Sequence, residues 1–263
     1  MKQVARFLHA ADRQLGKPFA GVGDLNKRVP LQGGGTSNGA RGRDQTESVI
    51  TINKLHFPIT TLGYGRRLGI WMQGCSIRCP GCISRDTWDA EPRHRITVAK
   101  LIAGCAEWLA EADGVTISGG EPFDQPDALR ELLRQLRARN TGDLLVFSGY
   151  ANEKLSAQHA DILALADVLI SEPFVAQARQ TLALRGSDNQ RVFLLTPLAR
   201  ERYPADLDRR AWEPQRRLDL MMEGDSIWMA GIPEPSAMAK LRAQLRAQGY
   251  DTATSDQPVP VRA

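Results

Sequence analysis

The chain has 263 residues, of which 42% are hydrophobic, so it can bury one sizeable core. It has no apolar run long enough to span a bilayer, which excludes a helical membrane protein. Its four cysteines are too few for a disulfide framework in a chain of this length, and we expect a reducing, cytoplasmic compartment.

The first 48 residues carry all of the excess positive charge. They hold eight Lys or Arg and four Asp or Glu, whereas the remaining residues hold 26 of each sign, for a formal net charge of +4. Arg6 interrupts the apolar stretch near the start, so we expect no secretory signal. Residues 31–48 are rich in Gly, Ser, Asn and Arg. This composition predicts a flexible basic extension over 1–48 rather than an arm that binds nucleic acid.

From Val49 onward, short apolar segments alternate with amphipathic ones. The segments that read as buried strands are 69–74, 114–120, 143–150, 167–174 and 191–197. Apolar residues recur at helical spacing at Leu101, Ile102, Cys105, Trp108 and Leu109, and again at Leu129, Leu132, Leu133 and Leu136. This alternation predicts an α/β protein of parallel βαβ units, with ligand sites at the carboxyl ends of its strands.

The end of the chain has a different pattern. Residues 216–233 predict two strands joined by a hairpin turn at Gly224 and Asp225. The next segment opens with prolines and ends at Gly249, which is typical of a capped helix. We therefore expect a domain over 49–250, preceded by the 1–48 extension and followed by a loose polar tail over 251–263.

Three cysteines lie in the segment GCSIRCPGC, residues 74–82. Cys75, Cys79 and Cys82 have three and then two residues between them. A structural zinc site and a ferredoxin-type cubane cluster each take four ligands, and His94, the nearest histidine, lies between two arginines. Cys105 falls on the apolar stripe of a predicted helix, where a cysteine is commonly a small buried hydrophobe. Three cysteines suit a four-iron cluster whose fourth iron is open for chemistry.

This cysteine spacing resembles that of radical S-adenosyl-L-methionine (SAM) enzymes. The segment SGGEP (118–122), which follows the next buried strand, resembles the second motif of that family. Further segments resemble the small activating enzymes that install a glycyl radical in anaerobic ribonucleotide reductase; they are DVLISEPF (167–174), LRGSDNQRV (184–192) and WMAGIP (228–233). The resemblance covers residues 49–233, with Ile83-Ser84 in the place where those activases usually carry His-Asn.

The resemblance implies a fold, two cofactors and a reaction. The fold is a partial open (β/α)6-type radical SAM barrel of about six parallel strands, with a C-terminal β-hairpin and helix. The cofactors are a 4Fe-4S cluster on the three cysteines and SAM. In this family one electron cleaves SAM to methionine and a 5'-deoxyadenosyl radical, which abstracts a hydrogen atom. The resemblance implies a protein substrate, a glycine of a glycyl radical enzyme, with reduced flavodoxin or ferredoxin as electron donor and no membrane partner.

The resemblance also implies that Gly119, Gly120 and Glu121 bind SAM beside the cluster. Ser148 and Tyr150 are further candidates, because FSGY (147–150) ends a strand at the same edge, although this strand end could equally pack against the next helix. The activase-like segment RGSDNQ adds Ser187, Asn189 and Gln190. Gly119 and Gly120 would allow the backbone to come close to the ligand, and the Glu121 carboxylate would favour the SAM ammonium. Ser187, Asn189 and Gln190 could equally contact the partner.

Several alternatives stay open at this point. SGGEP could be an ordinary turn from a strand into a helix, and RGSDNQ (185–190) has the residues of a simple polar turn. The chain could be a radical SAM enzyme that acts on another peptide or on a small molecule. A non-enzymatic iron-sulfur or zinc module is the least favoured hypothesis, because the sequence offers no fourth ligand near the three cysteines.

Overall fold

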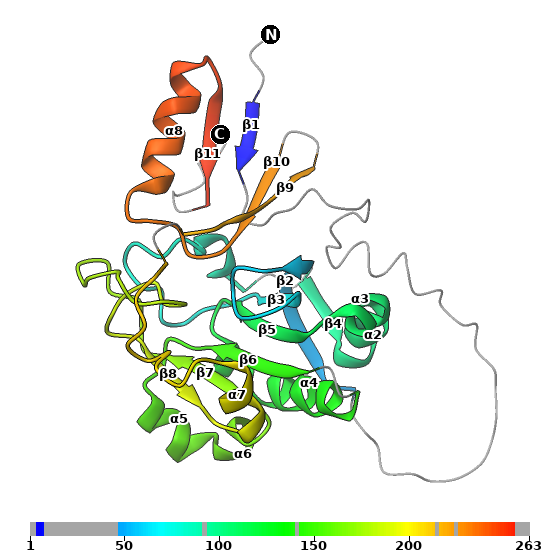
Figure 1. The fold of residues 1–263 in the computed structure, drawn as a ribbon. Helices are drawn as coiled ribbons and strands as arrows, with labels where there is room; N and C mark the ends of the chain where they lie inside the picture. Colours follow the sequence, from blue (N-terminus) through cyan, green and yellow to red (C-terminus); the bar gives the residue numbers. More distant parts are fainter. Residues whose placement is uncertain are drawn as a thin grey trace, which may run out of the picture.

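The computed structural model describes residues 4–7, 47–90, 94–139, 142–213, 216–223 and 226–255. These residues form a seven-stranded sheet with helices packed on it, and a smaller four-stranded sheet formed by the two ends of the chain (Figure 1). No helix in these ranges is both long enough and apolar enough to cross a membrane.

The larger sheet has the strand order β4-β2-β3-β5-β6-β7-β8. Its strands are β2 (Val49–Ile59), β3 (Arg67–Met72), β4 (Arg95–Thr97), β5 (Gly114–Gly119), β6 (Asp143–Phe147), β7 (Val168–Ser171) and β8 (Arg191–Leu194). Strands β3, β5, β6 and β7 are neighbours and parallel. Each strand expected from the sequence is present, and the glycine or polar residues at the ends of the expected segments belong to the loops that follow.

The expectation of about six parallel strands is wrong, because four strands of this sheet are parallel. Strands β2, β4 and β8 each run antiparallel to their neighbours. A parallel return needs a crossover, usually through a helix. Only a short loop joins β2 to β3, and residues 172–190, between β7 and β8, form turns instead of a helix. Both connections therefore bring the chain back antiparallel.

The helices and the core follow the predicted apolar pattern. The helices are α2 (Val98–Gly104), α3 (Ala106–Glu111), α4 (Pro126–Ala138), α5 (Asn152–Gln158), α6 (Ala160–Leu163) and α7 (Pro197–Arg202), with short 3-10 turns η1 (Arg85–Thr87) and η3 (Pro122–Asp124). Residues from α2, α3, α4 and α6 pack in one core cluster with β2, β3 and β5. Cys105 lies at the junction of α2 and α3, is 2% exposed and belongs to this core, which confirms its expected structural role.

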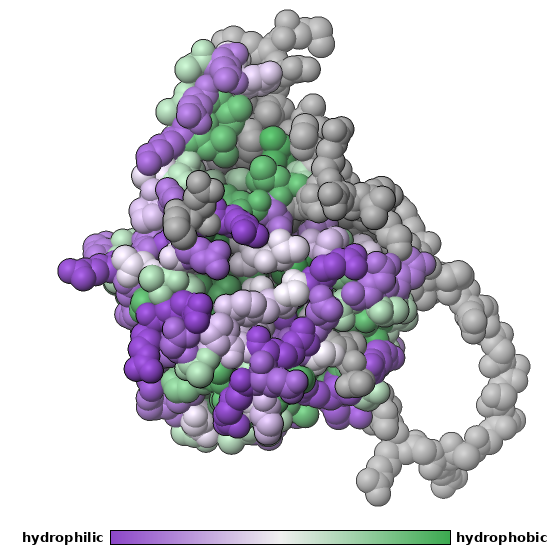
Figure 2. All heavy atoms as spheres, viewed as in Figure 1, coloured by the Kyte–Doolittle hydropathy of each residue, from purple (hydrophilic) through white to green (hydrophobic). Residues whose placement is uncertain are grey.

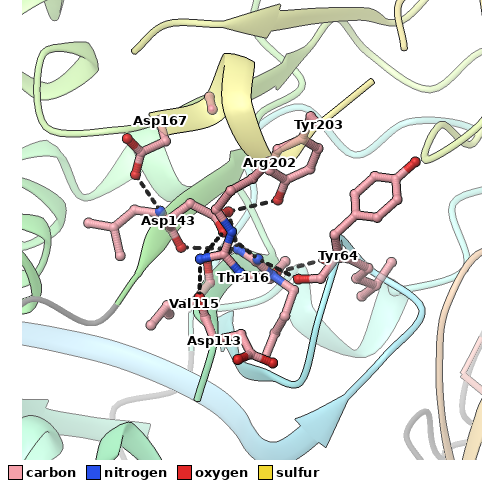
Figure 3. A network of polar contacts seen from close by, with 12 residues as sticks. Tyr64, Asp113, Val115, Thr116, Asp143, Asp167, Arg202 and Tyr203 are labelled. Carbon is pink, nitrogen blue, oxygen red and sulfur yellow. Dashed lines mark hydrogen bonds and ion pairs between the residues drawn. The ribbon is translucent and has the colours of Figure 1, made fainter. Parts of the chain in front are cut away.

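A buried ion pair joins the amino ends of the parallel strands. The Arg67 side chain at the start of β3 is fully buried and lies 2.8 Å from the Asp143 carboxylate at the start of β6. Thr116 accepts a hydrogen bond from Arg67 Nε at 2.7 Å, and the Tyr203 hydroxyl donates to Asp143 at 2.7 Å (Figure 3). This network fixes the end of the sheet opposite to the carboxyl ends of the strands.

The smaller sheet joins the two ends of the chain in the order β11-β1-β10-β9. Its elements are β1 (Val4–Phe7), β9 (Asp219–Glu223), β10 (Ser226–Ala230) and β11 (Asp251–Thr254), and α8 (Ala237–Ala247) packs on β11 (Figure 1). Strands β9 and β10 are antiparallel, as the hairpin prediction requires, although the expected turn at 224–225 lies outside the described residues. Gly249 follows α8 with a φ of +87°, which confirms the expected glycine cap.

Two segments expected to lack regular structure contain strands. Val4–Phe7 lies in the predicted extension and Asp251–Thr254 in the predicted tail, and these strands pair with each other in parallel. Such short strands depend on pairing across almost the whole length of the chain, which local composition does not reveal. The rest of the extension up to residue 46, and residues 256–263, lie outside the described residues.

The two parts of the molecule differ in surface character. In the view of Figure 2 the surface around α4 to α7 is mainly hydrophilic, whereas hydrophobic side chains gather on the upper part, around β9, β10 and α8. Leu220 of β9 is 51% exposed.

Candidate active site

The loops after β3, β5, β6 and β7 meet at one cavity of about 490 Å³. This is the edge of the sheet at which the sequence predicted a ligand site. Of the expected site residues, the cavity is lined by Cys75, Cys79, Cys82, Gly119, Gly120, Glu121, Ser148 and Gln190. Tyr150, Ser187 and Asn189 are not part of the lining.

The start of the cysteine loop is fixed by two backbone hydrogen bonds to residues 87 and 88. Gly74 N donates to Thr87 O at 2.7 Å, and Cys75 N donates to Trp88 O at 3.0 Å. Inside the loop, Cys82 N donates to Cys79 O at 3.0 Å. All three cysteines are free thiols, partly buried, and all three line the cavity.

Gly119 and Gly120 bring two backbone segments together. Gly120 N donates to Met72 O at 2.8 Å, and Glu121 N donates to Gly74 O at 2.9 Å. A Cβ on Gly120 would lie 2.0 Å from Gly74 O, and Gly119 has a φ of +97° with Met72 backbone atoms 2.6 to 2.7 Å from its missing Cβ. The two glycines therefore allow the backbone after β5 to pack closely against β3 and the cysteine loop. The sequence predicted that they make room for the ligand.

Glu121 is a buried carboxylate at the cavity and is 1% exposed. Its Oε1 accepts hydrogen bonds from Phe123 N at 3.0 Å and Ser148 Oγ at 2.8 Å, and its Oε2 accepts one from Gly149 N at 2.7 Å. Burial raises the pKa of Glu121 to about 7, against the effect of these three donors. A cationic group in the cavity would restore the charged form, so this carboxyl is suited to an ammonium ligand.

Tyr150 and Ser148 follow β6 but have different surroundings. Ser148 is 5% exposed and reaches the cavity through its bond to Glu121. The Tyr150 hydroxyl hydrogen-bonds to Asp124 Oδ1 at 2.8 Å and lies 2.9 Å from Ser76 Oγ in the cysteine loop. Tyr150 therefore connects the β6 loop to the cysteine loop from outside the cavity.

The RGSDNQ segment braces the loop after β7. Ser187 Oγ accepts from Val175 N at 3.1 Å, and Asn189 Nδ2 donates to Pro173 O at 2.8 Å. Gln190 is the expected residue of this segment that lines the cavity, where its Nε2 donates to Glu172 O at 3.0 Å. These bonds support a positioning role for Ser187 and Asn189 better than a direct contact with SAM.

Two parts of the cavity wall were not assigned to the site from the sequence. Trp88 lies beside the cysteine loop, and nothing in the spacing of the motif points to it. Residues 230–239 line the cavity together with Arg242 of α8. The WMAGIP segment resembles the activases, but no local pattern shows that its end and the start of α8 line the same cavity as the cysteine loop.

The donor set fits an iron-sulfur cluster. Among the described residues, no three Cys, His, Asp or Glu side chains converge on a position for a single metal ion. A four-iron cluster takes one thiolate per iron, so three thiols that line the same cavity can each bind a separate iron. The indole nitrogen of Trp88, another residue of the cavity lining, is buried and completes no hydrogen bond within the described ranges, and a cluster thiolate is an acceptor that could satisfy it.

Comparison with known proteins agrees with this geometry. A family model described as "4Fe-4S single cluster domain" matches residues 61–193. The anaerobic ribonucleoside-triphosphate reductase-activating protein of Escherichia coli K12 is 31% identical over 144 residues, which span 51% of this chain and 93% of that protein. The chain belongs to the radical SAM family of activating proteins. Its cofactors are therefore a 4Fe-4S cluster and SAM, and it is an enzyme.

Other members of the family match smaller parts of the chain. The anaerobic ribonucleoside-triphosphate reductase-activating protein of Enterobacteria phage T4 is 28% identical over 136 residues, 50% of this chain and 85% of that protein. The pyruvate formate-lyase-activating enzyme of Staphylococcus epidermidis is 37% identical over 84 residues, 30% of this chain and 34% of that protein. The model match ends at residue 193, so β9, β10, α8 and β11 lie beyond it.

Proposed function

We propose that this chain installs a glycyl radical in a partner protein, an anaerobic ribonucleotide reductase or a related glycyl radical enzyme. The main observation behind the proposal is that the three cysteines and Glu121 line the same cavity. Two relatives of different partner specificity, named for a ribonucleoside-triphosphate reductase and for pyruvate formate-lyase, support the same reaction class.

Each part of the cavity has a role in this reaction. Cys75, Cys79 and Cys82 would hold the cluster, which supplies the electron that cleaves SAM. Glu121, fixed by Ser148 and Gly149, would hold the SAM ammonium and so orient the ligand. The apolar residues of the cavity wall exclude water from the reactive site, which protects a carbon radical from side reactions.

We also propose the finer features that the resemblance implies. The seven strands would curve as a partial open barrel, with β4 and β8 at its open edges. Reduced flavodoxin or ferredoxin would donate the electron, and the protein would act in the cytoplasm. Residues 49–250 would form the catalytic domain, to which β1 and β11 add the edge of the smaller sheet.

A second candidate function is modification of a different peptide or of a small molecule. Ile83 and Ser84 favour it, because they stand where the activases usually carry His-Asn and both line the cavity. A changed wall is a plausible physical basis for a changed substrate.

The test is anaerobic incubation of the reconstituted protein with SAM, a reductant and the anaerobic ribonucleotide reductase of the same organism. We expect a glycyl radical signal in the electron paramagnetic resonance spectrum that requires all components. Cleavage of SAM without any glycyl radical on that reductase, or on a pyruvate formate-lyase-type enzyme, would favour the second candidate.

A further inference from the structure

Trp88 lies against the cysteine loop and is held there from several sides. Its carbonyl oxygen accepts from Cys75 N at 3.0 Å, and its own backbone N donates to Arg85 O at 3.1 Å. The Arg85 guanidinium lies over the indole, 4.9 Å from the ring centroid, and that of Arg78 lies 6.0 Å away. The ring therefore has a defined place beside the ligand loop, and both Trp88 and Cys82 line the cavity.

Within the part of the chain that the structure describes, no acceptor completes a full hydrogen bond with the indole N–H of Trp88, although its nitrogen is buried. A buried donor without an acceptor is costly, and such groups in native structures usually have a functional or ligand-linked explanation. The Cys82 sulfur is the hydrogen-bonding neighbour of the Trp88 side chain, and both residues line the cavity. A thiolate bound to iron carries negative charge, so it is a stronger hydrogen-bond acceptor than a thiol and would give this N–H the acceptor it lacks.

We propose that the Trp88 indole N–H donates a hydrogen bond to the Cys82 thiolate when the cluster is bound, and that it thereby sets the reduction potential. Trp88 acts through Cys82, so it is a positioning residue and not a catalytic one. The two nearby guanidinium groups strengthen the donor, because a cation over an indole ring withdraws electron density from it. The proposal depends on the cluster of this family and not on the identity of the partner protein.

The direction of the effect follows from charge. Adding one electron makes the cluster and its thiolate ligands more negative, so a hydrogen bond to a ligand sulfur stabilises the reduced state more than the oxidised state. Loss of the N–H should lower the midpoint potential. We expect the reduction equilibrium to shift by about tenfold, which is about 59 mV for a one-electron couple. SAM cleavage with a weak reductant should slow accordingly.

The experiment compares the reconstituted wild type with Trp88→Phe, which keeps an aromatic ring and removes the N–H. Trp212→Phe is the matched control, because the Trp212 indole N–H is also buried and, among the residues that the structure describes, completes no hydrogen bond. Arg216 lies 4.8 Å from the Trp212 ring centroid, and Trp212 is not part of the cavity lining. The readout is the midpoint potential in an anaerobic titration followed by electron paramagnetic resonance. We expect the cluster of Trp88→Phe to have a lower midpoint potential than that of the wild type, and the cluster of Trp212→Phe to have the wild-type potential. Equal potentials in all three proteins would overturn the proposal.

A second measurement on the wild type does not depend on the folding of a variant. Protein labelled with ¹⁵N in its indole rings is reduced and its cluster is examined by electron-nuclear double resonance. We expect a ¹⁵N coupling from one indole nitrogen, and we expect Trp88→Phe to lose it where that variant holds iron. A reduced cluster with no indole coupling in the wild type would show that the N–H does not reach a cluster ligand, and would refute the proposal.

Discussion

Glu121→Gln separates the binding of SAM from the assembly of the cluster. The substitution keeps the shape of the side chain and removes its charge. Because the three cluster thiols come from residues 75–82, the iron content of Glu121→Gln should stay close to that of the wild type. The contact between a carboxylate and an ammonium in a buried site contributes about 1.5 to 3 kcal/mol, so its loss should weaken SAM binding by roughly 10- to 100-fold.

The structure adds a second cost of this substitution. A glutamine side chain has one acceptor oxygen. In Glu121, Oε1 accepts two hydrogen bonds and Oε2 accepts a third. If the amide oxygen takes the place of Oε1, the Gly149 N–H faces an amide NH₂ and loses its acceptor. This bond is part-buried, so its loss should cost about 0.5 to 1.5 kcal/mol, and Glu121→Gln should unfold at lower denaturant concentration than the wild type.

The pH dependence of SAM affinity gives an independent readout. Burial raises the pKa of Glu121 to about 7, so the carboxyl is mostly protonated at pH 6 and mostly charged at pH 8. If the ammonium binds only the charged form, wild-type affinity should rise about tenfold from pH 6 to pH 8. Glu121→Gln has no such group and should lose this rise.

The assay is equilibrium binding of SAM to anaerobic protein of matched iron content. Glu131→Gln is the control, because Glu131 is a hydrogen-bonded glutamate on α4 that is outside the cavity lining. It should bind SAM as the wild type does at every pH. Unchanged affinity in Glu121→Gln beside an intact cluster would refute the SAM site, and SGGEP would be only a turn between elements.

Three further substitutions test the cluster ligands and the frame around the site. Cys105→Ala should keep about four irons per chain, whereas Cys79→Ala should lose the cluster; equal loss in both would show that the ligand set is wrong. Gly120→Ala should lower both thermal stability and iron content, because its Cβ would lie 2.0 Å from a backbone oxygen; normal values of both would contradict the close contact. Arg67→Met should destabilise the fold by about 3 kcal/mol in urea unfolding, since it removes the buried cation 2.8 Å from Asp143 and leaves the partly exposed Arg202, at 3.2 Å, as its ionic partner; a loss under about 1 kcal/mol would contradict this role.

The sequence predicted the parts of the site that depend on local patterns. The strands at 114–119 and 143–147 are short apolar runs, and the loops after them reach the cavity because parallel strands end at the same edge. Glu121 and the three cysteines were found from motif spacing. These features are encoded within a few residues of each other, so they can be read without a structure.

The rest depends on contacts between distant segments. The antiparallel direction of β8 follows from a helix-free connection that the alternating pattern did not reveal. The pairing of β1 with β11 joins opposite ends of the chain. Whether Ser187 points into the cavity or braces the loop after β7 is decided by its bond to Val175, which no periodicity predicts.

The most direct test of the central claim is SAM cleavage by the purified chain without any partner. Anaerobically reconstituted protein is reduced, mixed with SAM and analysed by chromatography for methionine and 5'-deoxyadenosine. We expect the two products in equal amounts, formed slowly by the wild type and not by Cys79→Ala. A fully iron-loaded, reduced wild-type protein that forms no 5'-deoxyadenosine would contradict radical SAM chemistry in this cavity.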